Sequence, residues 1–341
     1  MLGKGRGGLE QVALDYHHAL SAKGHQVITT LAPDSWAATQ AELLNYSTFM
    51  LNNRGEWDIF AAFKLRSLAK SSNSDAIICH GNRAIRLALK LSKGTIPIIA
   101  VAHNYKNKSF KACDAVFCIT QDLSRHIKAL GFRQEMIFHV PNMVYTDSIK
   151  HLTGNKNTMN RIGSLGRFVE KKGFDILLDA IAIAHNKISF TAAIGGNGPL
   201  ENHLKSQCDR LGIAEIVTFT GWVEDKNKFF NEIDLFILPS RHEPFGIVLI
   251  EAMAQGLPCI SLPSEGPSEI ITNNCDGIIV QSELAEDLAE AIINMLNSPD
   301  KARSLGFAGK ELVSTKYSDR QIAETLDVAL NNIIRLTTTS T

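Results

Sequence analysis

The sequence predicts an α/β protein made of two doubly wound parallel-sheet domains. Three observations support this fold class. Short apolar runs alternate with amphipathic stretches along the whole chain, which is typical of parallel strands joined by helices. The chain has 341 residues, more than one small hydrophobic core requires. A polar stretch without apolar periodicity, residues 142–161, separates two halves of similar size and is the best candidate for a linker.

The first domain is expected to comprise residues 1–145. Amphipathic stretches at residues 9–24 and 57–71 predict helices in it. Its apolar runs are short enough to be buried parallel strands, and they lie at residues 25–32, 75–81, 96–103, 115–120 and 136–142.

The second domain is expected to comprise residues 158–315 and to repeat the same rhythm. Its predicted strands are residues 161–167, 189–196, 215–221, 234–240, 258–264 and 277–280. In doubly wound sheets, ligands bind beyond the carboxyl ends of the strands. We therefore look for functional residues in the loops that follow these strands.

The composition is that of a globular protein in water, with 45% hydrophobic and 21% charged residues. The longest apolar run, residues 96–102, is much shorter than a membrane-spanning helix, and the N-terminus lacks an apolar signal region. Six cysteines without a C-x-x-C pair predict reduced core thiols and no zinc site. We therefore expect a cytoplasmic protein.

The net charge of zero hides an asymmetry. Residues 1–150 carry 18 Lys and Arg against 11 Asp and Glu, whereas the remainder carries 17 against 24. A basic first half suggests contact with an anionic partner, although scattered surface charge explains it equally well. The neutral total and the lack of a base-reading motif argue against nucleic acid as that partner.

The segment EPFGIVLIEAMAQGLP places Glu243 and Glu251 at either end of an apolar run. It follows a predicted strand, and we interpret it as a loop and a buried helix. Free N–H groups at the helix start, near Phe245, favour an anionic or hydroxyl-rich ligand. Carboxylates accept hydrogen bonds from sugar hydroxyls. As alternatives, Glu243 is a helix-terminal charge and Glu251 a structural acid, which is costly to bury unless it is paired.

A second loop carries Arg167, Lys171 and Lys172 after the strand predicted at residues 161–167. Two separated cations suit a diphosphate, because Arg binds it as a fork and Lys as a point charge. Solvated loop cations are the alternative. The glycine loop GGNGPL, which includes Gly196, either allows a close backbone approach to a ligand or simply turns the chain.

The N-terminal GKGRGG spells G-x-G-x-x-G, but no strand precedes it, so it does not predict a dinucleotide site. Gly8 still opens a helix that can present N–H groups to a phosphate. His80 and His103 end two predicted strands, where a structural role and a donor or proton-handling role are both open. The segment NYKNKSFKACD, residues 104–114, is either a docking surface for an anionic acceptor or membrane, or a solvated loop.

Common catalytic motifs are missing from the sequence. It contains no D-x-D triplet for a nucleotide-bound metal, no H-E-x-x-H, no G-x-S-x-G and no Walker lysine loop. We therefore expect no metal site.

Taken in order, these segments resemble the family-four glycosyltransferases, which are retaining enzymes of the GT-B fold. The resemblance covers residues 7 to 280, and the EPFG block with its E-x7-E spacing is its most specific part. It rests on GGLEQVALDYHHALSAKGHQV, DAIICHG, VAHN, VPN, GRFVEKKGFDILLDA, GGNGPL, FTGWVED, DLFILPSRHEPFGIVLIEAMAQGLPCI, and GPSEII before DGIIV. The resemblance implies two Rossmann-like domains facing a central cleft, with a helix at residues 318–336 packing back on the first domain.

The resemblance also implies how a nucleotide-sugar donor is held. Glu251 would bind the ribose hydroxyls. Arg167 and Lys172 would bind the diphosphate, assisted by the loop at Gly8. The glycine loop at Gly196 would approach the donor.

The remaining implied roles concern the sugar and the base. Glu243 and the backbone N–H groups of Phe245, Gly246 and Ile247 would hold the donor sugar. His103 would lie near the reacting carbon. Trp222 and Val223 would lie in the loop that contacts the base.

The implied reaction is sugar transfer with retention at the anomeric carbon, without a metal or other cofactor, because the cations stabilise the departing diphosphate. The implied acceptor is a glycan or a lipid-linked molecule in bacterial cell-envelope polysaccharide or lipopolysaccharide synthesis. Peripheral contact of the basic first domain with the inner face of the cytoplasmic membrane fits such an acceptor. Two alternatives stay open: a nucleotide-sugar epimerase of the same fold, and a non-catalytic protein that binds sugar nucleotides.

The start of the sequence departs from the family's pattern. Members normally begin with an apolar strand before the GG loop, whereas here only Met1 and Leu2 precede GKGRGG. That strand is central in a doubly wound sheet. The sequence therefore predicts either a start placed too late or a first sheet that is short by one strand.

Overall fold

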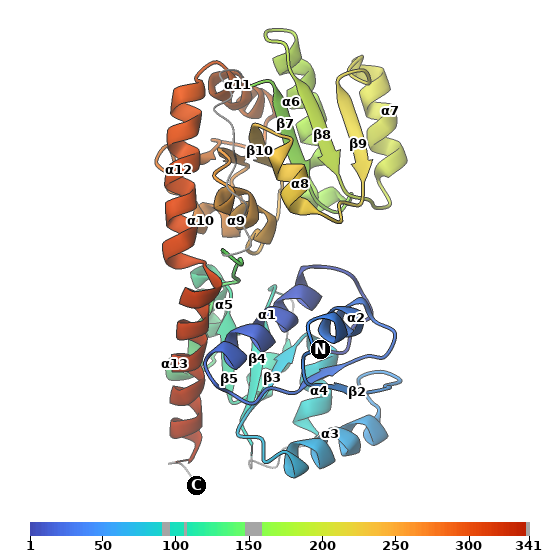
Figure 1. Cartoon of the computed structure of the whole chain (residues 1–341), viewed down its shortest axis with the longest axis vertical. Helices are drawn as coiled ribbons and strands as arrows, with labels where there is room; N and C mark the ends of the chain where they lie inside the picture. The colour runs from blue at the N-terminus through green and yellow to red at the C-terminus, as the bar shows by residue number, and fades with distance from the viewer. Residues whose placement is uncertain (91–95, 106–107, 147–158, 339–341) are drawn as a thin grey trace. The chain divides into compact units, whose positions relative to one another are not determined.

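The computed structural model describes residues 1–90, 96–105, 108–146 and 159–338. The chain divides into two compact units, which are drawn in Figure 1 with labels on most of their helices and strands. Unit 1 is Met1–Met143 with Asp319–Thr341, and unit 2 is Val144–Ser318. Both are α/β with parallel strands, which confirms the predicted fold class. Most of the predicted linker, residues 147–158, lies outside the described residues.

Unit 1 alternates strands with helices. Its strands are β1 (Thr29–Leu31), β2 (Thr48–Met50), β3 (Ile77–His80), β4 (Ile98–Ala102), β5 (Ala115–Cys118) and β6 (Ile137–His139). Its helices are α1 (Gly8–Ala22), α2 (Trp36–Leu43), α3 (Ile59–Ser71), α4 (Asn82–Leu89), α5 (Gln121–Ala129) and α13 (Asp319–Thr338), with short 3₁₀ helices η1 (Lys108–Ala112) and η2 (Gln134–Met136). Sequence analysis missed α2 and β2, because α2 has no clear apolar stripe and β2 has only three residues.

Helix α13 is packed within unit 1, at the far end of the sequence from α1. The Nζ atom of Lys23, just after α1, forms an ion pair with Glu324 of α13. Nearby, Nε2 of His25 lies 2.6 Å from Oδ1 of Asp327. These contacts hold the two ends of the sequence together in one unit.

The strands of unit 1 form two sheets instead of one. Strand β1 pairs with β2, while β3, β4, β5 and β6 form a four-stranded sheet. A cavity of about 1100 Å³ is lined by residues of β1, β3, α1 and α13.

Unit 2 has one continuous sheet. Its strands are β7 (Arg161–Leu165), β8 (Thr191–Gly195), β9 (Val217–Gly221), β10 (Leu235–Leu238), β11 (Cys259–Ser261) and β12 (Ile278–Ile279). Its helices are η3 (Glu170–Lys172), α6 (Phe174–His185), α7 (Glu201–Leu211), α8 (Lys226–Asn231), α9 (Ile247–Ala254), α10 (Glu265–Ile270), α11 (Ala285–Leu296) and α12 (Pro299–Lys316). All six predicted strands are present, each shorter than its apolar run.

The strand order in this sheet is β12-β11-β10-β7-β8-β9, with all pairs parallel. The chain winds outward from β7 in one direction through β9, then returns to the centre at β10 and winds the other way. The order reverses between β7 and β10, and ligands of doubly wound sheets bind at such a point. The loops after β7 and β10 therefore mark the expected site of unit 2.

The core of unit 2 is formed by apolar side chains of the sheet and of helices α6 and α11. Leu177, Leu178 and Ile181 of α6 are almost completely buried. The buried side chains account for the strong apolar character of the α6 sequence. All six cysteines of the chain are free, and five of them are buried, as expected for reduced thiols.

Helix α12 packs so closely on the end of α9 that a glycine is needed. A Cβ atom at Gly306 would lie 2.2 Å from the carbonyl oxygen of Gly256. We expect Gly306→Ala to lower the free energy of unfolding by about 1–3 kcal/mol, because backbone atoms would have to move apart. Urea unfolding measures this loss. Ser304→Ala, at an exposed position of the same helix, is the control, and equal losses in both variants would contradict the packing explanation.

Candidate functional site

The loop after β7 carries the predicted cations. Arg167 is exposed, whereas the side chain of Lys172, at the end of η3, is only 19% exposed. Gly173 follows with φ 63°, and a Cβ there would lie 1.9 Å from the carbonyl oxygen of Pro239. Only glycine allows this approach. The loop after β7 is therefore pressed directly against the loop after β10.

The loop after β10 brings Glu243 to Lys172. Glu243 is 9% exposed, and its Oε2 atom forms an ion pair with Nζ of Lys172. Oγ of Ser240 lies 3.4 Å from the same oxygen. The backbone N–H of Glu243 donates to Oε2 of Glu265, over 3.2 Å. Two residues predicted from separate motifs thus meet at the point where the strand order reverses.

The start of α9 lies directly after this acid. Phe245 is buried, Gly246 is the N-cap, and Ile247 is the first helical residue. The first N–H groups of a helix have no intrahelical acceptors and carry the positive end of the helix dipole. Glu243, Lys172 and these N–H groups therefore place charges of both signs at one edge of the sheet.

Glu251 lies one turn into α9. Both of its carboxylate oxygens accept hydrogen bonds from Nζ of Lys226, at 2.6 and 2.8 Å. Lys226 opens α8 and follows the loop that contains Trp222 and Val223, so the ion pair joins that loop to α9. Sequence analysis missed Lys226, because nothing in the sequence relates it to Glu251.

The glycine loop after β8 packs against the loop after β7 that carries the predicted cations. A Cβ at Gly196 would lie 1.8 Å from the carbonyl oxygen of Gly166, just before Arg167. A Cβ at Gly195 would lie 2.7 Å from Cγ2 of Val223. These close contacts give Gly196 and Val223 packing roles, and donor contact at both positions stays a prediction.

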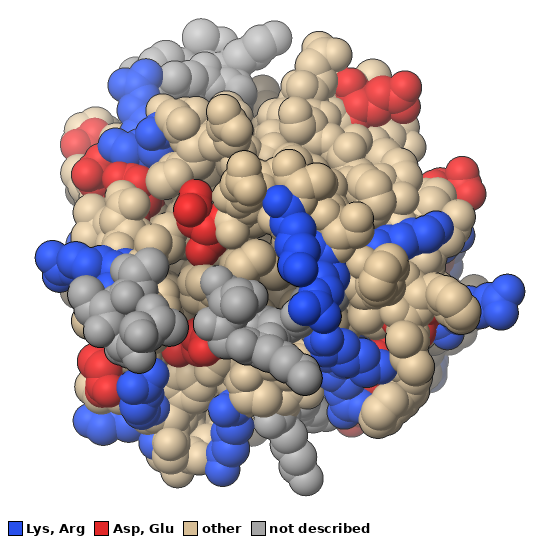
Figure 2. All heavy atoms as spheres, turned by 90° about the horizontal axis from the view of Figure 1, so that it is seen from below, with Lys and Arg blue, Asp and Glu red and all other residues tan. Residues whose placement is uncertain are grey.

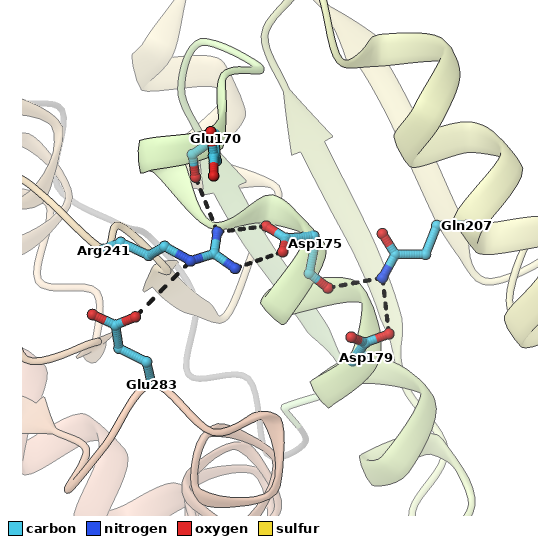
Figure 3. Close-up of polar contacts among 6 residues, drawn as sticks. All are labelled: Glu170, Asp175, Asp179, Gln207, Arg241 and Glu283. Atoms are coloured by element: carbon cyan, nitrogen blue, oxygen red, sulfur yellow. Dashed lines mark hydrogen bonds and ion pairs between the residues drawn. The ribbon is translucent and has the colours of Figure 1, made fainter.

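A network around Arg241, drawn in Figure 3, locks the two loops together. Arg241 follows β10, and its guanidinium binds Asp175 of α6 as a fork, at 2.7 and 2.6 Å. It also donates to the carbonyl oxygen of Glu170, over 2.9 Å, and lies 3.9 Å from Glu283. Burial alone would raise the pKa of Asp175, but the hydrogen bonds and charge of Arg241 outweigh it and lower that pKa.

The far side of the network extends to α7. Nε2 of Gln207 donates to the carbonyl oxygen of Asp175, over 3.0 Å, and to Oδ1 of Asp179, over 2.8 Å (Figure 3). The start of α6 is thereby fixed from both sides. Arg241 and Asp175 are positioning residues that sequence analysis missed, although Arg241 lies two residues before Glu243.

Two predicted residues, Gly8 and His103, belong to unit 1. Gly8 is the first residue of α1, and the glycine loop before it lies around the carboxylate of Glu10. A Cβ at Gly3 or Gly5 would lie 3.0 Å from Oε1 of Glu10. The N-terminal end of α1 is thus already faced by an acid of the chain itself.

His103 follows β4 and meets His80 of β3. Nε2 of His103 lies 3.2 Å from Nδ1 of His80, and the ring of Tyr16 packs edge-on against His80 at 4.8 Å. Burial lowers the pKa of His103 to about 4. The pKa of His80 is lowered as well, mainly by burial and to a smaller extent by the nearby His103 ring. Both rings are therefore neutral at pH 7.

Neither aromatic residue of the basic segment after His103 is fully exposed. Phe110 is 3% exposed. Tyr105 is half-buried, and its hydroxyl donates to Asp122 over 2.6 Å. Lys106 lies outside the described residues. These contacts argue against the interpretation of this segment as an aromatic docking surface.

Two family models together match nearly the whole chain. The model described as Glycosyltransferase Family 4 matches residues 6–148, and the model described as Glycosyl transferases group 1 matches residues 146–312. The chain belongs to the group 1, family 4 glycosyltransferases. The family predicted from the motifs is confirmed.

Relatives of known family resemble this glycosyltransferase over most of its length. The lipopolysaccharide core biosynthesis glycosyltransferase LpsE of Rhizobium meliloti is 26% identical over 324 residues, which cover 93% of this chain and 94% of LpsE. LpsD of the same organism is 30% identical over 215 residues, covering 61% of this chain and 60% of LpsD.

Solved structures share the fold of this glycosyltransferase. A glycosyltransferase from Rickettsia africae superposes with a TM-score of 0.87 at 17% identity, covering 98% of this chain and 97% of the other. Anabaena HepE, in complex with UDP and glucose, gives 0.85 at 18% identity, covering 97% and 98%. The fold is therefore that of the GT-B glycosyltransferases.

The fork between Arg241 and Asp175 is testable as a coupling. We expect Arg241→Lys and Asp175→Asn each to destabilise the glycosyltransferase and to be non-additive by about 1 kcal/mol, because a lysine cannot form the fork. Urea unfolding of both single variants and the double variant measures the coupling. Arg210→Lys, at an exposed position of α7, is the control, and strict additivity of the pair would contradict the role assigned to the network.

The histidine pair predicts how stability depends on pH. Unfolded imidazoles bind protons near pH 6.5, whereas folded His103 does so only near pH 4. The unfolded chain therefore takes up more protons in this window, and the folded state loses stability as the pH falls from 6.5 towards 4.

We expect His103→Asn to remove about 2 kcal/mol of the stability difference between pH 7 and pH 5. Urea unfolding at the two pH values provides the measurement. His203→Asn, at an exposed position of α7, is the control and should keep the wild-type difference. An unchanged difference in His103→Asn would show that this ring is not buried as a neutral group.

Proposed function

We propose that this glycosyltransferase moves a sugar from a nucleotide-diphosphate sugar to a glycan or lipid-linked acceptor, with retention at the anomeric carbon. The observation that carries the proposal is the meeting of Lys172 and Glu243 where the strand order of unit 2 reverses. One group suits a diphosphate and the other suits sugar hydroxyls. HepE, which shares the fold, has been solved with UDP and with UDP-glucose.

In this proposal the diphosphate competes with Glu243 for Lys172. A diphosphate carries more negative charge than one carboxylate, so it draws the Nζ atom of Lys172 towards itself. Glu243 is then released to accept hydrogen bonds from the sugar. Arg167 is exposed on the same loop and adds a second cation. The N–H groups at the start of α9 complete the positive side of the site.

The proposed chemistry needs no metal, because the positive charges are supplied by the chain. The bond from the anomeric carbon to the diphosphate oxygen breaks, and the diphosphate leaves with the electron pair. The acceptor oxygen forms the new bond on the same face of the sugar, and its proton passes to the departing diphosphate. Lys172 and Arg167 stabilise the negative charge that develops on the leaving group.

The acceptor is proposed from the relatives. LpsE is named for lipopolysaccharide core biosynthesis, and it matches over 93% of this chain. We therefore propose an acceptor in lipopolysaccharide core assembly. The described residues include no helix with the length and apolar character needed to cross a membrane.

Calorimetric titration with UDP, GDP and ADP tests donor binding. We expect at least one nucleotide to bind, with an affinity that chelator leaves unchanged. Lys172→Ala should weaken that affinity about tenfold or more, because a charge-assisted contact to phosphate is lost. Lys187→Ala, at an exposed position after α6, is the control and should bind as wild type does. Failure of all three nucleotides to bind would contradict the proposal.

The same protein can then be tested for turnover. Incubation of a donor with lipid extracts, read by mass spectrometry, should show the sugar on an acceptor. Incubation without an acceptor should leave the donor sugar's configuration unchanged. An epimerised donor would instead favour the epimerase reading, and turnover that survives Glu243→Ala unchanged would remove the role given to this acid.

A further inference from the structure

One face of unit 1, formed by helix α3 and the residues just before it, exposes large apolar side chains. Phe60 is 85% exposed, Trp57 and Ile59 are each 74% exposed, and Phe63 is 71% exposed. The opposite side of α3 is packed into unit 1 through Ala61, Ala62 and Ala69. These four large side chains therefore form a contiguous apolar area at the N-terminal end of a fixed helix, and such areas mark interaction sites.

Cations lie beside this apolar area. Lys64, Arg66 and Lys70 are exposed on the same helix, with Lys64 and Arg66 on opposite flanks of its solvent-facing side. From α4 and the residue after it, Arg86 and Lys90 approach the Trp57 ring, with Nζ of Lys90 5.0 Å from the ring centroid. Figure 2, which looks at the end of unit 1 where α3 lies, shows a band of Lys and Arg side chains beside uncharged atoms.

The two acids next to the apolar area are already engaged by the chain. Oε1 of Glu56 accepts from Nη1 of Arg86 over 2.7 Å. Asp58 caps α3 by accepting from the N–H of Ala61 over 2.9 Å, and it also accepts from the N–H of Arg54 over 2.9 Å. Both acids thus have partners within the chain, while the cations further along α3 face solvent.

We propose that this α3 surface docks the glycosyltransferase on an anionic phospholipid bilayer. The α3 surface is defined as Trp57, Ile59, Phe60, Phe63, Lys64, Arg66 and Lys70. The rings and the isoleucine enter the boundary between headgroups and acyl chains, and the three cations bind lipid phosphates.

The combination of apolar and basic residues selects this partner over others. A nucleic acid would use the cations but would leave four large apolar side chains in water, and a purely apolar protein groove would leave the cations unpaired. A bilayer interface satisfies both, because apolar chains and phosphates lie within one helix diameter of each other. The surface lies outside the segment of residues 104–114, where the sequence suggested membrane contact.

The proposal does not depend on the transfer reaction. Vesicle binding is measured without donor or acceptor, so its failure leaves the proposed reaction intact. Its success would explain how a protein without a described spanning helix reaches a lipid-linked acceptor.

Vesicle flotation of the full chain is the test. Vesicles of phosphatidylcholine alone are compared with equimolar phosphatidylcholine and phosphatidylglycerol at low and high salt. We expect binding to the anionic vesicles, weakened by salt. Lys64→Gln with Lys70→Gln should weaken it about thirtyfold, and Phe60→Ser with Phe63→Ser at least about tenfold. Equal binding of wild type and both double variants would overturn the proposal.

Matched controls separate docking from folding. Phe307→Ser removes an aromatic side chain that is 68% exposed on α12, and Lys301→Glu changes an exposed cation of the same helix. Both should bind vesicles as wild type does. Circular dichroism and thermal melting of every variant establish that it is folded.

A second readout locates the inserted surface. Brominated acyl chains quench tryptophan fluorescence on contact, so we expect quenching in wild type and its loss in Trp57→Phe, which keeps an aromatic ring. Quenching that survives in Trp57→Phe would place the lipid contact elsewhere and overturn the proposal. Light scattering tests whether the surface instead binds a second copy of the chain. A wild-type dimer that is dissociated by Phe60→Ser with Phe63→Ser, together with no binding to vesicles, would assign the surface to that second copy.

Discussion

The ion pair between Lys172 and Glu243 is the contact on which the rest of unit 2's site depends. It joins the two loops that leave the sheet where the strand order reverses, so it fixes the edge at which a ligand would bind. A nearly buried carboxylate needs a partner of opposite charge, and Lys172 supplies it. In the proposed function, an incoming phosphate takes over the cation and leaves the acid to bind hydroxyls.

Backbone geometry and a second set of charges hold that pair in place. Gly173 lets the first loop touch the backbone of the second, and Arg241 clamps the start of α6 through its fork with Asp175. Lys226 likewise holds Glu251 in place, because its Nζ atom donates to both carboxylate oxygens of that acid. Three carboxylates of the second half, Glu243, Asp175 and Glu251, therefore serve as internal partners of Lys172, Arg241 and Lys226.

Unit 1 uses its charges differently. Its histidine pair is buried and neutral, and the carboxylate of Glu10 fills the glycine loop at the start of α1. The cations of α3 instead face solvent beside exposed rings. The positive balance of residues 1–150 is thus partly a surface property of one helix and its neighbourhood. Its strands also form two sheets, whereas those of unit 2 form one continuous sheet.

The sequence by itself determined the class of fold, the family and most strands, because apolar periodicity and ordered motifs are local properties of the chain. It also identified Lys172, Glu243 and Glu251 as candidates, because each stands out from its neighbours. Only the tertiary structure decided which charged side chains pair with one another. Lys226 and Arg241 become visible as partners of Glu251 and Asp175 only after folding, since the pairs are 25 and 66 residues apart. Phe110 and Phe60 make the same point. Packing buries the first ring and exposes the second, and burial is set by neighbours that the local sequence does not specify.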